Sequence, residues 1–171
     1  MMALRLLPDR RASASNFFRP GPACYAPGMR VIRQIVLHHT ATAATATLDD
    51  IRRMHVARGF RDVGYHYLLR RDHLGLVEQL HGRPVEQAGA HAKGHNAYSI
   101  GVSMVGNYDN NPLPGTMLDA AASLLAYLCD AHDLPASAVV GHRELAATAC
   151  PGRYVDMDLV RERVAELLEK P

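Results

Sequence analysis

Short β-branched apolar runs alternate along this chain with segments of helical periodicity, and this alternation is the feature that most constrains its fold. The runs RQIVLHH (33–39), SIGVSMVG (99–106) and SAVVGH (137–142) predict buried strands. An aromatic segment at 64–70, a turn at 72–75 and a second segment at 76–80 predict a hairpin. Helical spacing of apolar residues predicts helices over 48–58, 116–133 and 155–170. Strands alternating with helices predict a single α/β domain with a central mixed sheet flanked by helices.

The first predicted helix has clear signals at both ends. Thr47 is followed three residues later by Asp50, a spacing typical of a capping box, and Gly59 can end the helix. Leu48, Ile51 and His55 then share one helical face, so we expect His55 to be a core histidine.

The length of 171 residues fits one domain with a short appendage. We expect a basic Pro/Gly-rich segment over 1–28 and the folded domain over 29–171. Residues 1–30 carry five arginines and one aspartate, whereas the remainder is close to neutral, which does not favour nucleic-acid binding. The segment could touch an anionic surface. The sequence lacks an 18-residue apolar stretch and a standard secretory signal, so neither a membrane span nor a signal peptide is expected.

Reactive side chains are concentrated where predicted strands end. His38 and His39 end one strand, His142 ends another, and Cys150 follows eight residues later. Two histidines and a thiolate are a zinc donor set that leaves a fourth position free. Side chains alternate along a strand, so only one of His38 and His39 can join such a set, and alternation alone leaves open which one. The spacing is weakly specific, because the chain must turn back between His142 and Cys150.

Other polar groups admit ordinary structural roles. His91 and His95 lie in a long predicted loop over 82–97 and could reach a ligand, although loop histidines are usually solvated. His66 is expected to pack within its strand. The three cysteines are Cys24, Cys129 and Cys150, an odd and widely spread set that does not form a disulfide framework.

Four stretches together resemble the zinc-dependent N-acetylmuramoyl-L-alanine amidases of type 2, a family that includes phage lysozyme-type amidases and peptidoglycan recognition proteins. These stretches, which follow the family's order, are IVLHHTAT (35–42), FRDVGYHYLLRRD (60–72), HAKGHNAYSIGVSMVGNYD (91–109) and GHRELAATACPG (141–152). The resemblance covers roughly residues 30–168.

The resemblance implies a role for particular residues. It makes His38, His142 and Cys150 the ligands of a Zn²⁺ ion, and Tyr65 and Thr148 catalytic residues. Some phage members carry lysine at the position of Thr148, which puts any lysine-dependent step in doubt here. The loop residues His91 and Asn96 match the part of the groove that binds substrate. Members that bind cell wall without cleaving it typically lack the cysteine that this chain keeps.

The resemblance also implies an activity. The expected reaction is zinc-dependent hydrolysis of the amide bond between N-acetylmuramic acid and L-alanine, in peptidoglycan or a muropeptide. The expected protein is a monomeric lytic enzyme (an endolysin), cytoplasmic until released, whose basic N-terminal segment could contact an anionic envelope. The alternatives are a cytoplasmic muropeptide-recycling amidase and a non-catalytic peptidoglycan-binding receptor.

Overall fold

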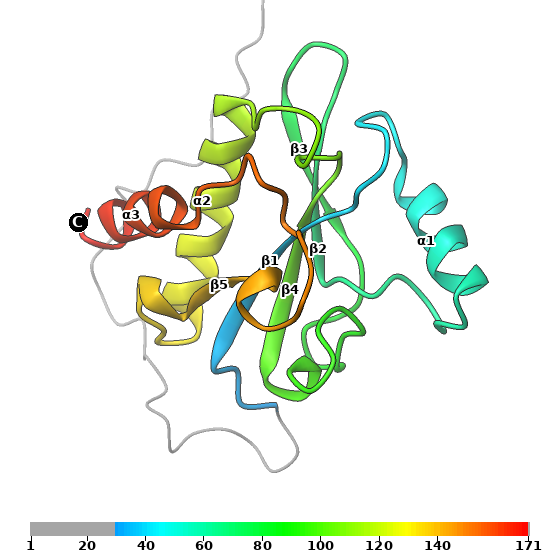
Figure 1. Ribbon diagram of the computed structural model, residues 1–171. Coiled ribbons are helices and arrows are strands. Elements are labelled where there is room, and N and C mark those ends of the chain that lie inside the picture. Colours follow the sequence, from blue (N-terminus) through cyan, green and yellow to red (C-terminus); the bar gives the residue numbers. More distant parts are fainter. Residues whose placement is uncertain (1–29, 171) are drawn as a thin grey trace, which may run out of the picture.

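The computed structural model describes residues 30–170, and a five-stranded sheet in the order β3-β2-β4-β1-β5 lies at its centre (Figure 1). The strands are β1 (Gln34–His39), β2 (Tyr67–Arg71), β3 (Val77–His81), β4 (Ser99–Met104) and β5 (Val139–Gly141). β2 and β3 pair antiparallel and all other neighbours pair parallel, so the sheet is mixed, as predicted. The predicted basic segment over 1–28 lies outside the described residues.

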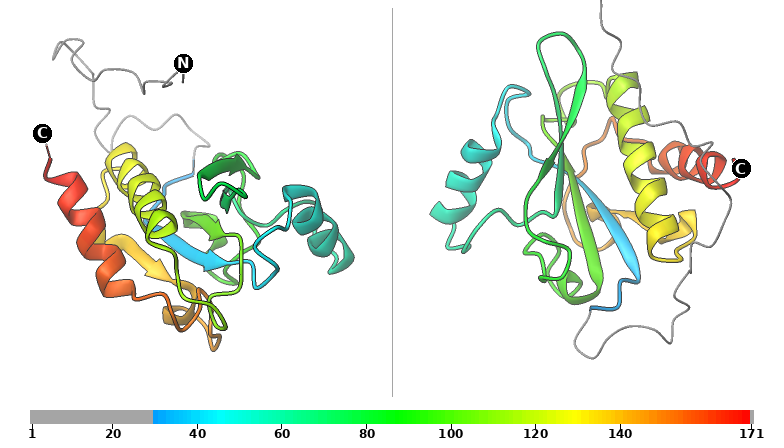
Figure 2. Two further views of the ribbon diagram at one scale, coloured as in Figure 1. Left: turned by 90° about the horizontal axis from the view of Figure 1, so that it is seen from above. Right: turned by 180° about the vertical axis from the view of Figure 1, so that it is seen from behind.

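Helices cover both faces of the sheet. They are α1 (Leu48–Ala57), α2 (Gly115–Ala131) and α3 (Met157–Leu168), with short 3-10 turns η1 (Asn96–Tyr98), η2 (Ala136–Ala138) and η3 (His142–Glu144). α2 and α3 pack side by side over one face, and α1 lies on the other side of the sheet (Figure 2). Within residues 30–170, none of the helices has the length and apolarity needed to cross a membrane.

The two faces of β4 differ in side-chain size, and this difference makes room for a site. Ile100, Val102 and Met104 point into the main core beneath α2 and α3. The alternate residues Ser99, Gly101 and Ser103 are small and point to the face that carries α1. Aromatic rings can therefore lie directly against the sheet on that face.

The predicted elements all occur, with shifted ends. Thr47 and Asp50 form the predicted capping box, and Gly59 follows the helix with a φ of 86°. The prediction of a strand from residue 64 was wrong for its first three residues. The Gly64 carbonyl accepts from the Ala90 N–H and the Tyr65 carbonyl from the Arg83 N–H, so this backbone pairs with the following loop.

Candidate metal centre

Three donor side chains converge at the end of β1. The ligand atoms of His38, His142 and Cys150 all lie within 4.8 Å of one another. His38 Nδ1 is 3.5 Å from Cys150 Sγ, and the rings of His38 and His142 have centroids 4.5 Å apart. In a tetrahedral zinc site the nitrogen and sulfur donors are about 3.6 Å apart, given the usual bond lengths. The donor types and their spacing therefore fit zinc.

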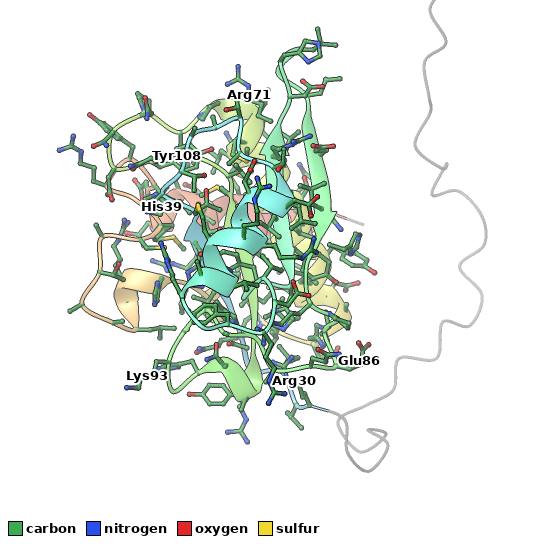
Figure 3. The ribbon with its side chains drawn as sticks, turned by 90° about the vertical axis from the view of Figure 1, so that its right-hand side faces the viewer. Arg30, His39, Arg71, Glu86, Lys93 and Tyr108 are labelled. Carbon is green, nitrogen blue, oxygen red and sulfur yellow. The ribbon has the colours of Figure 1, made fainter. Side chains whose placement is uncertain are left out.

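The sheet register brings the two histidines together. Leu37 of β1 pairs with Gly141 of β5, so His38 and His142 follow at the same end of two parallel strands. His39 points to the opposite face, where its Nδ1 accepts the Tyr108 N–H at 3.1 Å (Figure 3). Of the two histidines between which alternation left the choice open, the cluster contains His38 and not His39.

A folded-back loop brings Cys150 to the strands. The Arg143 N–H donates to the Cys150 carbonyl at 2.7 Å, and the Arg143 guanidinium donates to the carbonyls of Gly152 and Val155. Gly152 has a φ of 112°, and a Cβ there would lie 2.5 Å from the carbonyl carbon of Tyr108. The tight passage of the loop against Tyr108 therefore requires glycine.

Burial dominates the electrostatics of the donors. It holds the pKa of His38 well below its usual value, and the neighbouring histidines act in the same direction. Burial also raises the pKa of Cys150 to about 11, although the His39 N–H that donates to Sγ opposes the shift. A metal ion bound here would therefore have to displace the thiol proton.

Tyr65 lies against the donor cluster with its phenol protonated. Its ring centroid is 5.2 Å from that of His38 and 5.3 Å from that of His55. Burial raises the pKa of Tyr65 to about 12, so the hydroxyl stays a hydrogen-bond donor through the physiological range. The buried hydroxyl of Ser103 lies beside it and opposes part of that shift in pKa. His55 is the satisfied core histidine predicted, since its Nδ1 accepts the Gly64 N–H.

The remaining predicted residues take distinct positions. Thr148 is exposed, and its Oγ1 accepts the Cys150 N–H at 3.2 Å, which leaves the hydroxyl proton free to donate. His91 is buried with Nδ1 3.1 Å from His38 Nε2. Asn96 Oδ1 accepts the N–H groups of His91 and Ala92, so this oxygen holds the loop.

Arg30 shapes the same loop and was not predicted from the sequence. Its guanidinium donates to five carbonyls, those of Val85, Gln87, Asn96, Ala97 and Ser99. Figure 3 shows Arg30 at the lower end of the molecule, well below His39. An arginine beside a predicted domain boundary carries no local signal of such a role, because its partners lie more than 50 residues away.

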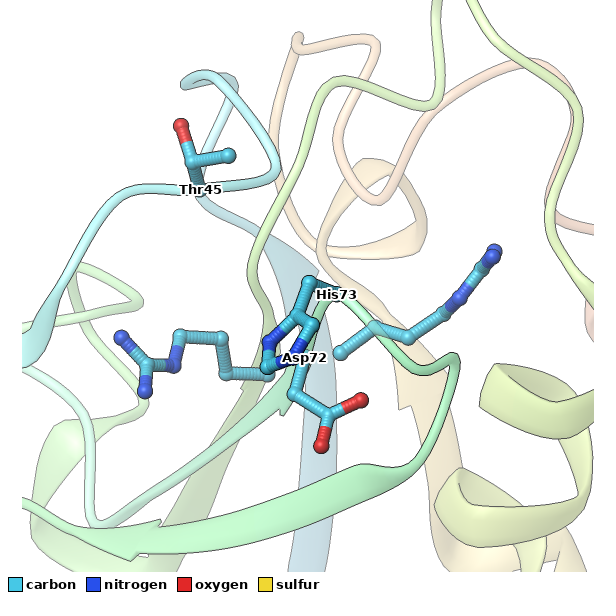
Figure 4. Close-up of a pocket in the computed structure, with 5 residues that line it drawn as sticks. Thr45, Asp72 and His73 are labelled. Atoms are coloured by element: carbon cyan, nitrogen blue, oxygen red, sulfur yellow. The ribbon is translucent and has the colours of Figure 1, made fainter.

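Two hollows lie near the tip of the β2–β3 hairpin, and no donor of the cluster lines either of them. The larger, about 590 Å³, extends from Thr42–Thr45 to Val105–Asn111. The smaller, about 190 Å³, is lined by Thr45, Arg70, Arg71, Asp72 and His73 (Figure 4). The Asp72 carboxylate already accepts the N–H groups of Leu74 and Leu76 and so closes the hairpin turn. Since neither hollow includes a donor of the cluster, the donor geometry is what identifies the site.

Acid should destabilise the metal-free fold through its buried histidines. Burial lowers the pKa of His66 to about 4 from the ordinary 6.5, while its Nδ1 accepts the Gly101 N–H. The unfolded chain therefore binds more protons between these values, and stability falls as the pH drops from 6.5 towards 4. The shift corresponds to roughly 3 kcal/mol.

Urea midpoints measured with a chelator from pH 7 to pH 4 test this expectation. His66→Gln should flatten the pH dependence. Equal pH dependence in wild type and His66→Gln would show that His66 does not contribute to it.

Comparisons with known proteins agree with the geometry. Residues 28–153 match the family model described as N-acetylmuramoyl-L-alanine amidase. The endolysin of Klebsiella phage KP32 is 38% identical over 125 residues, covering 69% of this chain and 79% of that protein. Peptidoglycan-recognition protein SC1a of Drosophila melanogaster is 35% identical over 129 residues, covering 70% of this chain and 68% of that protein. The solved structure of the N-acetylmuramoyl-L-alanine amidase LysC from Clostridium intestinale URNW superposes with a TM-score of 0.72 at 26% identity. The superposition covers 80% of this chain and 87% of that chain.

Proposed function

The chain belongs to the N-acetylmuramoyl-L-alanine amidase family, and from this premise we propose that it is a zinc hydrolase acting on peptidoglycan. The bond cleaved is the amide between N-acetylmuramic acid and L-alanine. The observation that carries the proposal is the convergence of His38, His142 and Cys150, whose ligand atoms lie within 4.8 Å of one another. A receptor that only binds peptidoglycan has no need of such a set.

Zinc held by these donors would supply an activated water molecule and polarise the scissile carbonyl. The protein's own residues then act on the amide. Tyr65, kept protonated by burial, donates its hydroxyl hydrogen to the carbonyl oxygen as negative charge develops there. Thr148 donates to the same oxygen with the proton that its contact to Cys150 leaves free. Glu144 takes no part, since its carboxylate accepts from Gly141 and Arg161.

The endolysin relative supports a lytic role in preference to recycling of soluble muropeptides. That relative has the highest identity of the proteins compared above. A lytic enzyme must act on the intact polymer, whereas a recycling amidase acts on released fragments. Substrate binding by Asn96 remains a prediction, whereas the buried His91 ring contacts His38 and can affect the reaction only through that residue.

Mass spectrometry of digests tests the bond and the substrate together. Purified protein with one equivalent of zinc is incubated with intact sacculi and, separately, with soluble anhydro-muropeptides. We expect new N-terminal L-alanine and free lactyl carboxylates, and faster cleavage of sacculi. A chelator should stop the reaction and added zinc should restore it.

Each other outcome has a definite meaning. Cleavage within the glycan or within the stem peptide would overturn the proposed bond. Binding to sacculi with no cleavage of either substrate would identify a receptor. Preferential cleavage of the soluble fragments would identify a recycling amidase.

A further inference from the structure

A second histidine contacts the metal-facing ring from behind. His91 Nδ1 lies 3.1 Å from His38 Nε2, and the two rings meet edge-on with centroids 5.1 Å apart. On the other side of the His38 ring, Nδ1 faces Cys150 Sγ at 3.5 Å. A neutral imidazole carries its proton on one nitrogen only, so the partner of Nε2 determines whether Nδ1 is free to bind a metal.

The hydrogen bonds around His91 determine which residue donates the proton between His38 Nε2 and His91 Nδ1. Ser99 Oγ donates its proton to the His95 carbonyl at 2.8 Å, so towards His91 Nε2, at 3.4 Å, it can only accept. His91 Nε2 therefore carries the proton of the His91 ring. His91 Nδ1 is left as an acceptor and takes the Nε2 proton of His38, which leaves His38 Nδ1 unprotonated.

We propose that His91 is a positioning residue: it holds His38 in the tautomer whose free Nδ1 points at His142 and Cys150. This inference rests on the proposed zinc site. It gives the ligand His38 a hydrogen-bond partner, His91, that does not itself bind the metal. Ligand histidines commonly donate their second ring nitrogen to such a partner, and its loss typically weakens metal binding by about 10–100-fold.

The fold keeps the His91 ring in one place. The ring lies against the backbones of Gly89 and Gly101, and a Cβ on Gly101 would come within 2.6 Å of its Cγ. Asn96 Oδ1 accepts the backbone N–H of His91 at 2.9 Å, which fixes the main chain that carries the ring. Since His91 is only 8% exposed and its ring is bounded by two glycines, the ring has little room to turn away from His38.

A matched pair of substitutions at His91 distinguishes the loss of the hydrogen-bond acceptor from the loss of side-chain volume. Asparagine and leucine have nearly the same form, but only His91→Asn offers an oxygen where Nδ1 lies. Zinc dissociation constants are measured without substrate, by competition with a chromophoric chelator. We expect about 10–100-fold weaker binding in His91→Leu and a value within about threefold of wild type in His91→Asn. Equal affinities in the two variants would overturn the proposal.

A spectroscopic measurement does not depend on how the variants fold. Long-range proton–nitrogen NMR spectra of metal-free wild type at neutral pH should show His38 protonated at Nε2 and His91 at Nε2. A His38 ring protonated at Nδ1 would overturn the proposal. Because neither readout needs turnover, failure of the proposed amidase activity is distinguishable from failure of this inference.

Discussion

Cys150→Ala is expected to abolish both zinc binding and peptidoglycan cleavage. The substitution removes the only sulfur donor of the cluster and leaves two histidines, too few to hold the ion tightly. Zinc affinity should fall by more than the roughly 10–100-fold that follows the loss of a hydrogen-bond partner of a ligand. Elemental analysis of the dialysed protein and the sacculus assay measure the two losses.

Cys129→Ala is the matched control. Cys129 is also a buried free thiol whose pKa burial raises to about 11, but it lies on α2 in the main core. This variant should keep one equivalent of zinc and full activity, with a modest loss of stability. A Cys150→Ala protein that still bound zinc stoichiometrically and cleaved sacculi would refute the ligand assignment. Serine is nearly the same size as cysteine, so Cys150→Ser should lose zinc as Cys150→Ala does if the thiolate, and not the packing of the side chain, is what matters.

Tyr65→Phe should lower kcat while leaving zinc affinity and KM nearly unchanged. The phenyl ring can keep its place between His38 and His55, so the change is confined to the hydroxyl. Loss of one donor to a developing oxyanion typically costs about 100–1,000-fold in kcat. Since burial holds the pKa of Tyr65 near 12, the wild-type rate should show no loss from phenol ionisation up to about pH 10.

Tyr67→Phe provides the comparison for a neighbouring phenol. Tyr67 is half-buried, and its ring packs against the main core on the other face of the sheet. Its variant should retain the wild-type rate. If Tyr65→Phe were as fast as Tyr67→Phe, the Tyr65 hydroxyl would have no role in the reaction, and the Thr148 hydroxyl would be the remaining donor to test.

The sequence predicted the sheet well because its strands are strongly patterned. β1 and β4 read as apolar β-branched runs and fall within one or two residues of their predicted ends. The strand predicted from residue 64 began late because Gly64 and Tyr65 pair with loop residues that are distant in sequence. Such pairing depends on the tertiary path of the 82–97 loop, which has no periodicity to reveal it.

The donor cluster was only partly predictable from spacing. Alternation separated His38 from His39, but the choice between them depends on which face of β1 meets the loop that carries Cys150. The resemblance supplied that choice, and the geometry agrees with it. The contact between His91 and His38 was beyond local reasoning, although the alternating small residues Ser99, Gly101 and Ser103 were a signal that rings pack against β4.

The two farthest donors in sequence, His38 and Cys150, are separated by 112 residues of chain. An ion bound between them would act as a cross-link that closes most of the domain into a ring, and closing a long loop restricts the unfolded chain more than closing a short one. A nascent chain that ends before β5 contains only one of the three ligands. The complete cluster therefore requires β5 and the loop that carries Cys150 to be in place against β1, so one equivalent of tightly bound zinc would report that these distant parts of the chain have come together.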